Sequence, residues 1–369
     1  MKRIFFVLVV FLNVILFFGT IKSSVFDVIK RDSDSALVAY PKDRYNLTKD
    51  ILLQGISELK ETSYWEKIDI LDLCGCSLLE DLAWIEFPPH LRELYLSECT
   101  GLRDLSTAVF QEGLGVLYLY RCEGLTDLSD IRFPVSLEKL SLSGCIGITS
   151  LEGVSFPDSL IDLNLSGCIG LISLERIVFP RLLEILNLAW CTGLTSLRSV
   201  IFPSYLRELN LYGCEGLASL SGVVFPDQLE KLNLGLCTSI TDLFSANFPA
   251  NLLVLDLTRS GIRRLAGVIF PNRLRELNVL MCEGLTDLYD VRLPKSLKNL
   301  DFWGSANISI LPRCLHRLPN LSYLNVEGTK ISSYLEKAGF GFYVGYAPFG
   351  VSSLLEQIKL VMAGYKEEG

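Results

Sequence analysis

The stretch Leu91-Arg-Glu-Leu94-Tyr-Leu96-Ser-Glu-Cys99 decides the fold, because the same frame returns about every 23 residues along most of the chain. Its leading aliphatic residue recurs at Ile68, Leu91, Leu114, Leu137, Leu160, Leu183, Leu206, Leu229, Leu252, Leu274, Leu297 and Leu321, with one interval a residue short and one a residue long. The shared pattern reads LxxLxLxxCxGLTDLxxVxFPxx. Twelve copies over residues 68–331 predict one array of stacked units, rather than the two or three domains that 369 residues would ordinarily suggest.

Each repeat carries the pattern of one coil with an apolar inside. In LxL the two leucines point to one side of a short strand, while the residue between them points to the other. No single coil can bury its leucines, so the coils must stack and their strands form a parallel sheet. Most return paths carry Phe-Pro, as at Phe87, Phe133, Phe156, Phe179, Phe202, Phe225, Phe248 and Phe270. Proline fixes φ and removes a donor, so we expect extended or 3-10 segments there, with a stacked column of phenylalanines.

The repeat resembles that of the leucine-rich repeat family, in its short, cysteine-containing form. The GLTDL motif is also similar to that of the cysteine-containing and bacterial surface subclasses. The resemblance covers residues 68–331. It implies an α/β solenoid with a parallel sheet on the concave face and short extended or 3-10 segments on the convex face.

Nine of the eleven cysteines share one register position: Cys76, Cys99, Cys122, Cys145, Cys168, Cys191, Cys214, Cys237 and Cys282. Ser260, Ser305 and Thr329 fill it in the other units, which indicates a compact group that bonds to loop backbone inside the coil. We therefore expect buried thiols. The alternative is a chain of disulfides between adjacent coils. Cys74-Gly-Cys76 is a lone CxC and weak support for a metal site.

Two polar columns follow from the same register. Asp81, Asp104, Asp127, Ser150, Ser173, Ser196, Ser219, Asp242 and Asp287 stand where the return path begins, and we expect them to cap turns. At the strand position that faces outward, an Asn/Asp column begins at Asn164 and includes Asn187, Asn210, Asn233, Asp256, Asn278, Asp301 and Asn325. We expect these amides to pair with one another along the sheet.

The two ends of the chain differ from the array. Lys2 and Arg3 precede an apolar run over residues 4–21, so residues 1–24 are predicted to be a signal peptide or a signal-anchor. Residues 25–67 are predicted to be an N-terminal cap whose helix, starting at Thr48, turns Leu52, Ile56 and Leu59 to the first coil. Residues 332–369 are predicted to be a C-terminal cap with an amphipathic helix over 353–362, although a docking helix is an alternative.

Aromatic side chains stand out on the expected concave face. Tyr95, Tyr118 and Tyr120 cluster in the second and third repeats, Trp190 and Tyr212 follow, and Trp303 lies near the end. Trp190, Leu236 and Met281 share a further column and could add an apolar edge. Exposed tyrosine and tryptophan are typical anchors of protein interfaces. We therefore predict that these six aromatic residues bind a protein partner.

The composition narrows the function further. A net charge of −8, with no strip of one sign, argues against a nucleic-acid partner. Two histidines, and no nucleophile elbow, phosphate loop or metal cluster, argue against an enzyme and against a cofactor. The leading hypothesis is a secreted or membrane-anchored protein-binding module, with a possible tether through residues 4–21. The alternative is a cytoplasmic adaptor or effector of the same fold, which free cysteines would suit.

Overall fold

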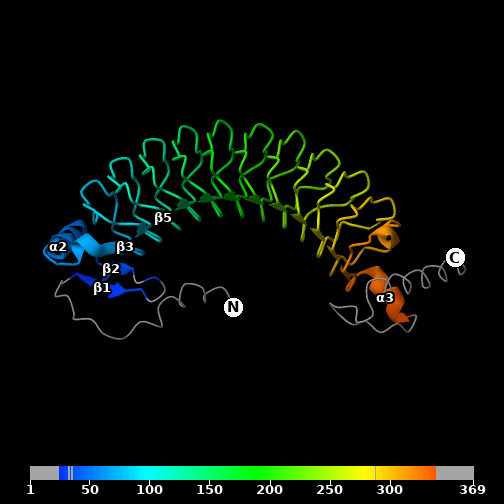
Figure 1. Ribbon diagram of the computed structural model, residues 1–369, viewed down its shortest axis with the longest axis horizontal. Helices are drawn as coiled ribbons and strands as arrows, with labels where there is room; N and C mark the ends of the chain where they lie inside the picture. The colour runs from blue at the N-terminus through cyan, green and yellow to red at the C-terminus, as the bar shows by residue number, and fades with distance from the viewer. Residues whose placement is uncertain (1–24, 32–33, 35, 287, 338–369) are drawn as a thin grey trace, which may run out of the picture. The chain divides into compact units, whose positions relative to one another are not determined.

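The computed structural model describes residues 25–31, 34, 36–286 and 288–337, and the chain divides into two compact units, residues 1–145 and 146–369. Within each unit, coils follow one another at the period of the sequence repeat. Each coil contributes one short strand, and neighbouring strands pair in parallel (Figure 1). The described part of the chain is thus a parallel-sheet solenoid with few helices, as the repeat predicted.

The first unit opens with an antiparallel hairpin of β1 (Phe26–Lys30) and β2 (Leu37–Pro41). The helix α2 (Lys49–Lys60) and the 3-10 helix η2 (Trp65–Lys67) follow. Strand β2 pairs in parallel with β3 (Ile68–Asp72), and the sheet continues through β4 (Glu93–Tyr95), β5 (Val116–Tyr118) and β6 (Lys139–Ser141). The hairpin thereby covers what would otherwise be the open edge of β3.

The second unit holds the later coils. Its strands are β7 (Asp162–Asn164), β8 (Ile185–Asn187), β9 (Glu208–Asn210), β10 (Lys231–Asn233), β11 (Val254–Asp256), β12 (Glu276–Asn278), β13 (Asn299–Asp301) and β14 (Tyr323–Asn325). The 3-10 helix η3 (Leu315–Arg317) precedes β14, and the helix α3 (Lys330–Lys337) follows it. The parallel pairing keeps one register, so each central leucine stands beside the next, as Leu209 beside Leu232.

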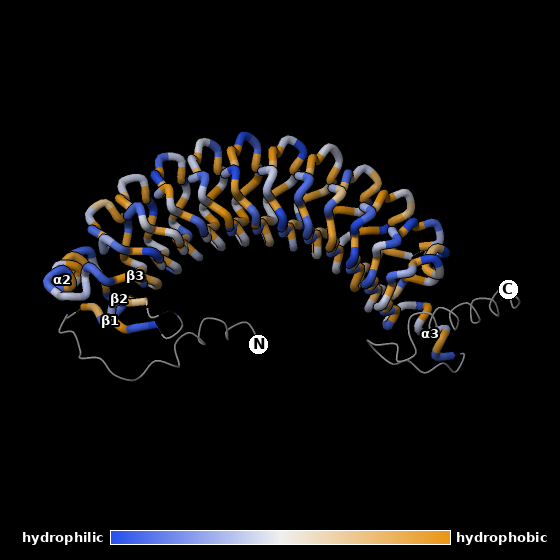
Figure 2. Tube along the Cα trace, viewed as in Figure 1, coloured by the Kyte–Doolittle hydropathy of each residue, from blue (hydrophilic) through white to orange (hydrophobic). Residues whose placement is uncertain are grey.

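The leucines of the repeat form the core of each unit. Leu209 in the middle of β9 is buried, as are Leu206 before the strand, Leu211 after it and Leu217 in the following turn. In Figure 2 apolar residues recur at the same points of successive coils. The alternation that the sequence predicted for LxL is therefore confirmed, and the return path adds further apolar contacts.

The return path is extended and punctuated by single turns. The amide of Val200 donates to the carbonyl of Leu197 at 3.2 Å, and that of Leu206 to Pro203 at 3.1 Å. The phenylalanine column stacks as expected: the Phe179 and Phe202 rings lie 6.3 Å apart at 14°, and Phe202 and Phe225 repeat this geometry. Phe87 and Phe110 stack at 6.0 Å in the first unit.

The structure confirms the predicted helix before the first repeat and adds a hairpin that the sequence did not indicate. Thr48 caps α2 by accepting the amide of Ile51, and Leu52, Ile56 and Leu59 are buried. A Cβ atom at Gly55 would lie 2.7 Å from a carbon of the Phe26 ring, so α2 packs closely on β1. Glycine allows this approach because it has no side chain.

The ladder cysteines are buried free thiols, as expected, and the described cysteines form no disulfide. Ladder thiols donate across to the preceding coil: Cys99 donates to the Leu73 carbonyl at 3.2 Å, and Cys214 donates to that of Leu188 at 3.2 Å. Ser305 Oγ makes the equivalent bond to Val279 at 2.6 Å. Cysteine, serine and threonine share this position because each fits a small volume and carries a donor.

The column of Asp and Ser at the start of the return path caps turns, as predicted. Asp104 Oδ1 accepts the amide of Ser106 at 2.7 Å, and Ser219 Oγ accepts that of Ser221 at 3.0 Å. The bond to Ser106 holds the pKa of Asp104 below its ordinary value. Asp287, residues 1–24 and the helix predicted over 353–362 lie outside the described residues. No helix of the described chain has the length and apolar character needed to cross a membrane.

Candidate partner-binding surfaces

In most strands of the second unit, the outward-facing residue at the strand end accepts a hydrogen bond from its own chain two residues further on. Asn164 Oδ1 accepts the amide of Ser166 at 3.0 Å. The same bond joins Asn187 to Ala189, Asn210 to Tyr212, Asn233 to Gly235, Asp256 to Thr258, Asp301 to Trp303 and Asn325 to Glu327. The expectation that these amides pair with one another is therefore wrong for the amide oxygen. A local turn wins because the accepting N–H lies only two residues away.

These turns fix the backbone that carries the predicted aromatic anchors of the second unit. Because Asn210 holds the amide of Tyr212, and Asp301 that of Trp303, each aromatic residue leaves its strand in a defined direction. The backbone at these two aromatic positions is therefore ordered without any partner. The polar column therefore supports the neighbouring aromatic positions.

The first unit brings two of its three predicted tyrosines into direct contact. The rings of Tyr95 and Tyr118 are stacked, with centroids 5.0 Å apart and planes 5° apart. Both are half-buried, whereas Tyr120 is 41% exposed. Stacking fixes Tyr95 and Tyr118 in one orientation, so they offer a rigid aromatic face.

The hydroxyl of Tyr95 is already engaged. It donates to Glu93, whose carboxylate also accepts two hydrogen bonds from the Arg31 guanidinium, at 2.9 and 3.2 Å. Burial raises the pKa of Tyr95, and the Glu93 hydrogen bond and charge raise it further. Tyr95 therefore stays protonated, and its ring face rather than its hydroxyl is available to a partner.

The second unit holds Trp190 against Tyr212. The two ring centroids lie 5.4 Å apart at an interplanar angle of 77°, an edge-to-face pair. A Cβ atom at Gly213 would lie 2.7 Å from the Trp190 ring, and one at Gly235 would lie 2.7 Å from the Tyr212 ring. Each ring thus lies over a glycine of the following coil, and Trp190 still keeps 36% of its surface exposed.

Trp190 belongs to a column with left-handed backbone, which the sequence did not reveal. The residue before each ladder position has φ between +50° and +77° in every coil, and it is glycine at Gly75, Gly144, Gly167, Gly213, Gly304 and Gly328. The other coils place Glu98, Arg121, Trp190, Leu236, Arg259 and Met281 there. A side chain in this conformation costs roughly 1 kcal/mol relative to glycine. The predicted apolar edge of Trp190, Leu236 and Met281 is part of this column.

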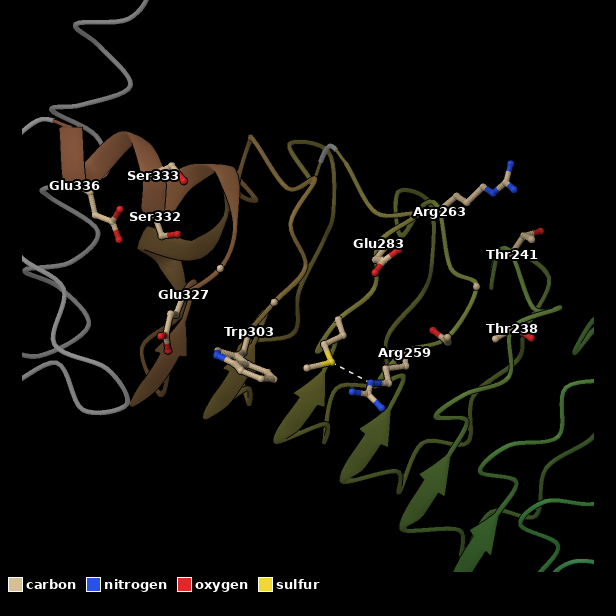
Figure 3. Close-up of a pocket in the computed structure, with 16 residues that line it drawn as sticks. Thr238, Thr241, Arg259, Arg263, Glu283, Trp303, Glu327, Ser332, Ser333 and Glu336 are labelled. Carbon is tan, nitrogen blue, oxygen red and sulfur yellow. Dashed lines mark hydrogen bonds between the residues drawn. The ribbon is translucent and has the colours of Figure 1, made fainter. Parts of the chain in front are cut away.

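Trp303 lies in a different setting, in a pocket at the carboxyl edge of the last strands. The cavity measures about 1050 Å³ and is lined by coils of the second unit and by α3. Trp303 is 38% exposed within it (Figure 3). Arg259 and Glu327, which the sequence analysis did not single out, line the same pocket. They were missed because the pocket depends on the docking of α3, a helix outside the repeat.

Charged side chains at the start of the strands are exposed and pair with opposite charges on neighbouring coils. Lys231 Nζ donates to Glu208 at 2.6 Å, and Arg207 lies 3.4 Å from Glu230. Exposed pairs of this kind contribute between about 0 and 1 kcal/mol each, so they serve solubility more than stability.

The described residues include no group of three or more His, Cys, Asp or Glu side chains arranged to hold a metal ion. The ladder thiols are poor nucleophiles, because burial raises the pKa of Cys122 and of Cys214 to about 12. Cys74, the outlying member of the CxC, is half-buried, and burial raises its pKa to about 12 as well.

Comparison with known proteins agrees with the repeat. The family model of the BspA-type leucine-rich repeat region matches in six copies, over residues 166–258 and 194–310. No curated protein matches the chain in sequence.

Solved structures similar to the chain include two leucine-rich repeat proteins and the functional domain of InlJ. One from Bacteroides ovatus is 14% identical, with a TM-score of 0.37 and coverage of 86% of this chain and 92% of that one. One from Leptospira interrogans is 18% identical, with a TM-score of 0.32 and coverage of 73% and 87%. The functional domain of InlJ from Listeria monocytogenes, which includes a cysteine ladder, is 15% identical, with a TM-score of 0.29 and coverage of 72% and 64%. The twelve sequence repeats, the parallel strands and this match together show a leucine-rich repeat solenoid, in which residues 166–310 are similar to the BspA-type repeat region.

Proposed function

We propose that this chain is a non-enzymatic protein-binding module that holds a partner protein through exposed aromatic side chains at the sheet face and its edge. One observation carries the proposal: several aromatic rings outside the leucine core are held in fixed orientations at half-buried or exposed positions. Tyr95 stacks on Tyr118, and Trp190 leans on Tyr212 and over Gly213. Interface hot spots are enriched in large aromatic side chains with fixed orientations.

The strained backbone conformation of Trp190 also supports a binding role for this side chain. Its position is glycine in six other coils, and its backbone has φ +63°. The fold therefore does not need a tryptophan there, and strain of this kind is common where a side chain serves binding.

Affinity capture with the full chain tests the proposal. We expect Trp190→Ala and Tyr120→Ala each to weaken retention of captured proteins at least about tenfold, since hot-spot truncations commonly cost more than 1 to 2 kcal/mol. Ile201→Ala is the matched control, because it removes an 83% exposed apolar side chain from the return path. Unchanged retention by both aromatic variants, with their thermal unfolding intact, would exclude the proposed surface.

We further propose that residues 1–24 direct export or membrane tethering, on the basis of Lys2 and Arg3 followed by the apolar run over 4–21. The free thiols of the ladder suit a cytoplasmic adaptor, the alternative function. Their burial makes them compatible with an oxidising compartment too. Fusion of residues 1–30 to a reporter protein distinguishes export from a cytoplasmic location. A reporter found in the membrane or outside the cell supports export, and a wholly cytosolic reporter favours the adaptor.

A further inference from the structure

The pocket around Trp303 is divided by charge. Figure 3 shows Glu327 and Glu336 at the α3 end, Trp303 next to Glu327, and Arg259 and Arg263 toward the opposite end, with Glu283 near them. Within the part of the chain that the structure describes, these charged side chains make no ion pair, in contrast to Lys231 and Arg207 at the strand starts. The pocket therefore has a carboxylate end at Glu327 and Glu336, and an end that carries the two arginines with the single carboxylate of Glu283 beside them.

The acidic end has the composition of a cation site. Trp303 presents part of its ring, and the carboxylates of Glu327 and Glu336 line the same cavity. Tryptophan is the best aromatic partner for an ammonium or guanidinium group, and carboxylates add direct attraction. A lysine or arginine side chain fits this combination.

Arg259 provides the positive charge at the basic end of the pocket, and the fold does not require an arginine at this position. Arg259 has φ +57° at the position that is glycine in six other coils. Its Nε donates to Met281 Sδ at 2.9 Å, so the guanidinium is positioned over the neighbouring coil while its other N–H groups remain for a ligand. The hydroxyls of Thr238 and Thr241 line this end, and they suit a carboxylate.

The spacing of the two ends fixes the form of the ligand. Arg259 follows β11 and Glu327 follows β14, three strand steps apart, or roughly 14 Å at about 4.8 Å per step. Residues i and i+4 of an extended peptide lie about 13 Å apart and point to the same side. We propose that this pocket binds an extended segment of the partner protein that carries a basic side chain and an acidic side chain four residues apart. This inference rests on the proposed protein-binding function and names the chemistry of the bound segment.

Titration with short peptides tests the pocket directly. The probes are acetyl- and amide-capped pentapeptides of sequence Lys-Ser-Gly-Ser-Asp, Asp-Ser-Gly-Ser-Lys, Lys-Ser-Gly-Ser-Lys and Asp-Ser-Gly-Ser-Asp, followed by NMR against the full chain at low salt. We expect one of the mixed-charge peptides to bind at least about fivefold more tightly than either like-charged peptide, because only it satisfies both ends.

Two variants test which end of the pocket binds which peptide side chain, and each has a control variant in the first unit. Arg259→Gly should remove the preference for aspartate without weakening the fold, since glycine relieves the left-handed backbone. Glu327→Gln should remove the preference for lysine. Arg121→Gly is the control for Arg259→Gly, because both arginines stand at the left-handed position. Glu98→Gln is the control for Glu327→Gln, because it removes the charge of a carboxylate in the first unit. Both controls should leave peptide binding unchanged.

The outcomes separate this inference from the proposed function. Absent binding, or equal affinity for all four peptides, overturns the pocket proposal even if Trp190→Ala and Tyr120→Ala abolish protein capture. Conversely, selective peptide binding that Arg259→Gly and Glu327→Gln remove, together with unchanged capture by the aromatic variants, upholds the pocket and rejects the aromatic surface.

Discussion

At the scale of single residues, the ladder position shows how one small donor stabilises a coil. The Cys214 thiol is buried and donates to the Leu188 carbonyl of the preceding coil, and Ser305 does the same to Val279. The position selects for size and for a donor, and it does not require sulfur chemistry. Burial keeps the thiol protonated by raising its pKa to about 12, which preserves the donor.

This account predicts an asymmetry between two substitutions at Cys214. Cys214→Ser should change the free energy of unfolding by no more than about 1 kcal/mol, because the hydroxyl keeps the bond to Leu188. Cys214→Val should cost about 2 kcal/mol or more, since it removes the donor and overfills the site. Chemical denaturation measures both. Equal stability of the two variants would mean that neither the bond nor the volume matters here.

Much at this scale could be predicted from the sequence, because a repeat acts as its own alignment. Replacement of cysteine by serine and threonine at one register position indicated a small buried donor. The partner carbonyl could not be predicted, since the bond spans 26 residues and depends on how adjacent coils are offset. The left-handed position before the ladder was also missed, because Arg259 and Trp190 stand where a glycine would have revealed it.

At the scale of elements, partly buried ion pairs hold the N-terminal hairpin to the first repeats. Arg44 donates two hydrogen bonds to the Asp72 carboxylate, at 2.9 and 2.8 Å, and a third to the Cys74 carbonyl at 2.7 Å. Arg31 binds Glu93 in the same two-point manner. These contacts join the segment around β1 and β2 to β3 and β4, where paired backbone alone would leave the hairpin weakly held.

The same contacts make the first unit sensitive to acid. Burial raises the pKa of Asp72, but the hydrogen bonds and charge of Arg44 outweigh it and leave the pKa below its ordinary value; Arg31 and Tyr95 do the same for Glu93. A carboxyl whose pKa is lower in the folded state stabilises the fold above its unfolded pKa, near 4. That stability is lost as the pH falls through the folded pKa.

We therefore predict that hydrogen exchange at β1 and β2 accelerates as the pH drops below about 4, after correction for intrinsic rates. Asp72→Asn should flatten this dependence and loosen the hairpin already at neutral pH. Asp81→Asn is the control, because Asp81 accepts only a local amide, that of Ala83. A hairpin that keeps its protection at pH 3 would show that these ion pairs do not hold it.

The elements divide into those that the sequence predicted and those that it did not. Helix α2 was predicted because Leu52, Ile56 and Leu59 form an apolar stripe at helical spacing, and the structure adds Thr48 as its N-cap. The hairpin and α3 were not, since β1 ends in exposed residues and its pairing depends on contacts with β3. The sequence placed the six aromatic residues of the proposed binding surface, whereas the pocket around Trp303 arises only where α3 meets the last coils.

At the scale of the molecule, each unit behaves as a stack in which a coil is supported by its two neighbours. The strands of the second unit pair only with adjacent strands, and the thiol bonds and phenylalanine stacks also join consecutive coils. Stability in such a stack is a sum of coil and interface contributions, so a local defect weakens its neighbours first.

Removing one central leucine should therefore unfold the second unit locally rather than as a whole. Leu209→Ala in β9 creates a cavity at a 1% exposed site, at a cost of about 2 to 5 kcal/mol. We expect hydrogen exchange to accelerate most at β8, β9 and β10 and least at β13 and β14. Leu300→Ala in β13, which is equally buried, should reverse that order. Uniform acceleration across β7 to β14 in both variants would instead mean that the unit opens as one cooperative body. The nearest-neighbour description would then fail, because every coil would share the cost of a defect rather than only the coils in contact with it.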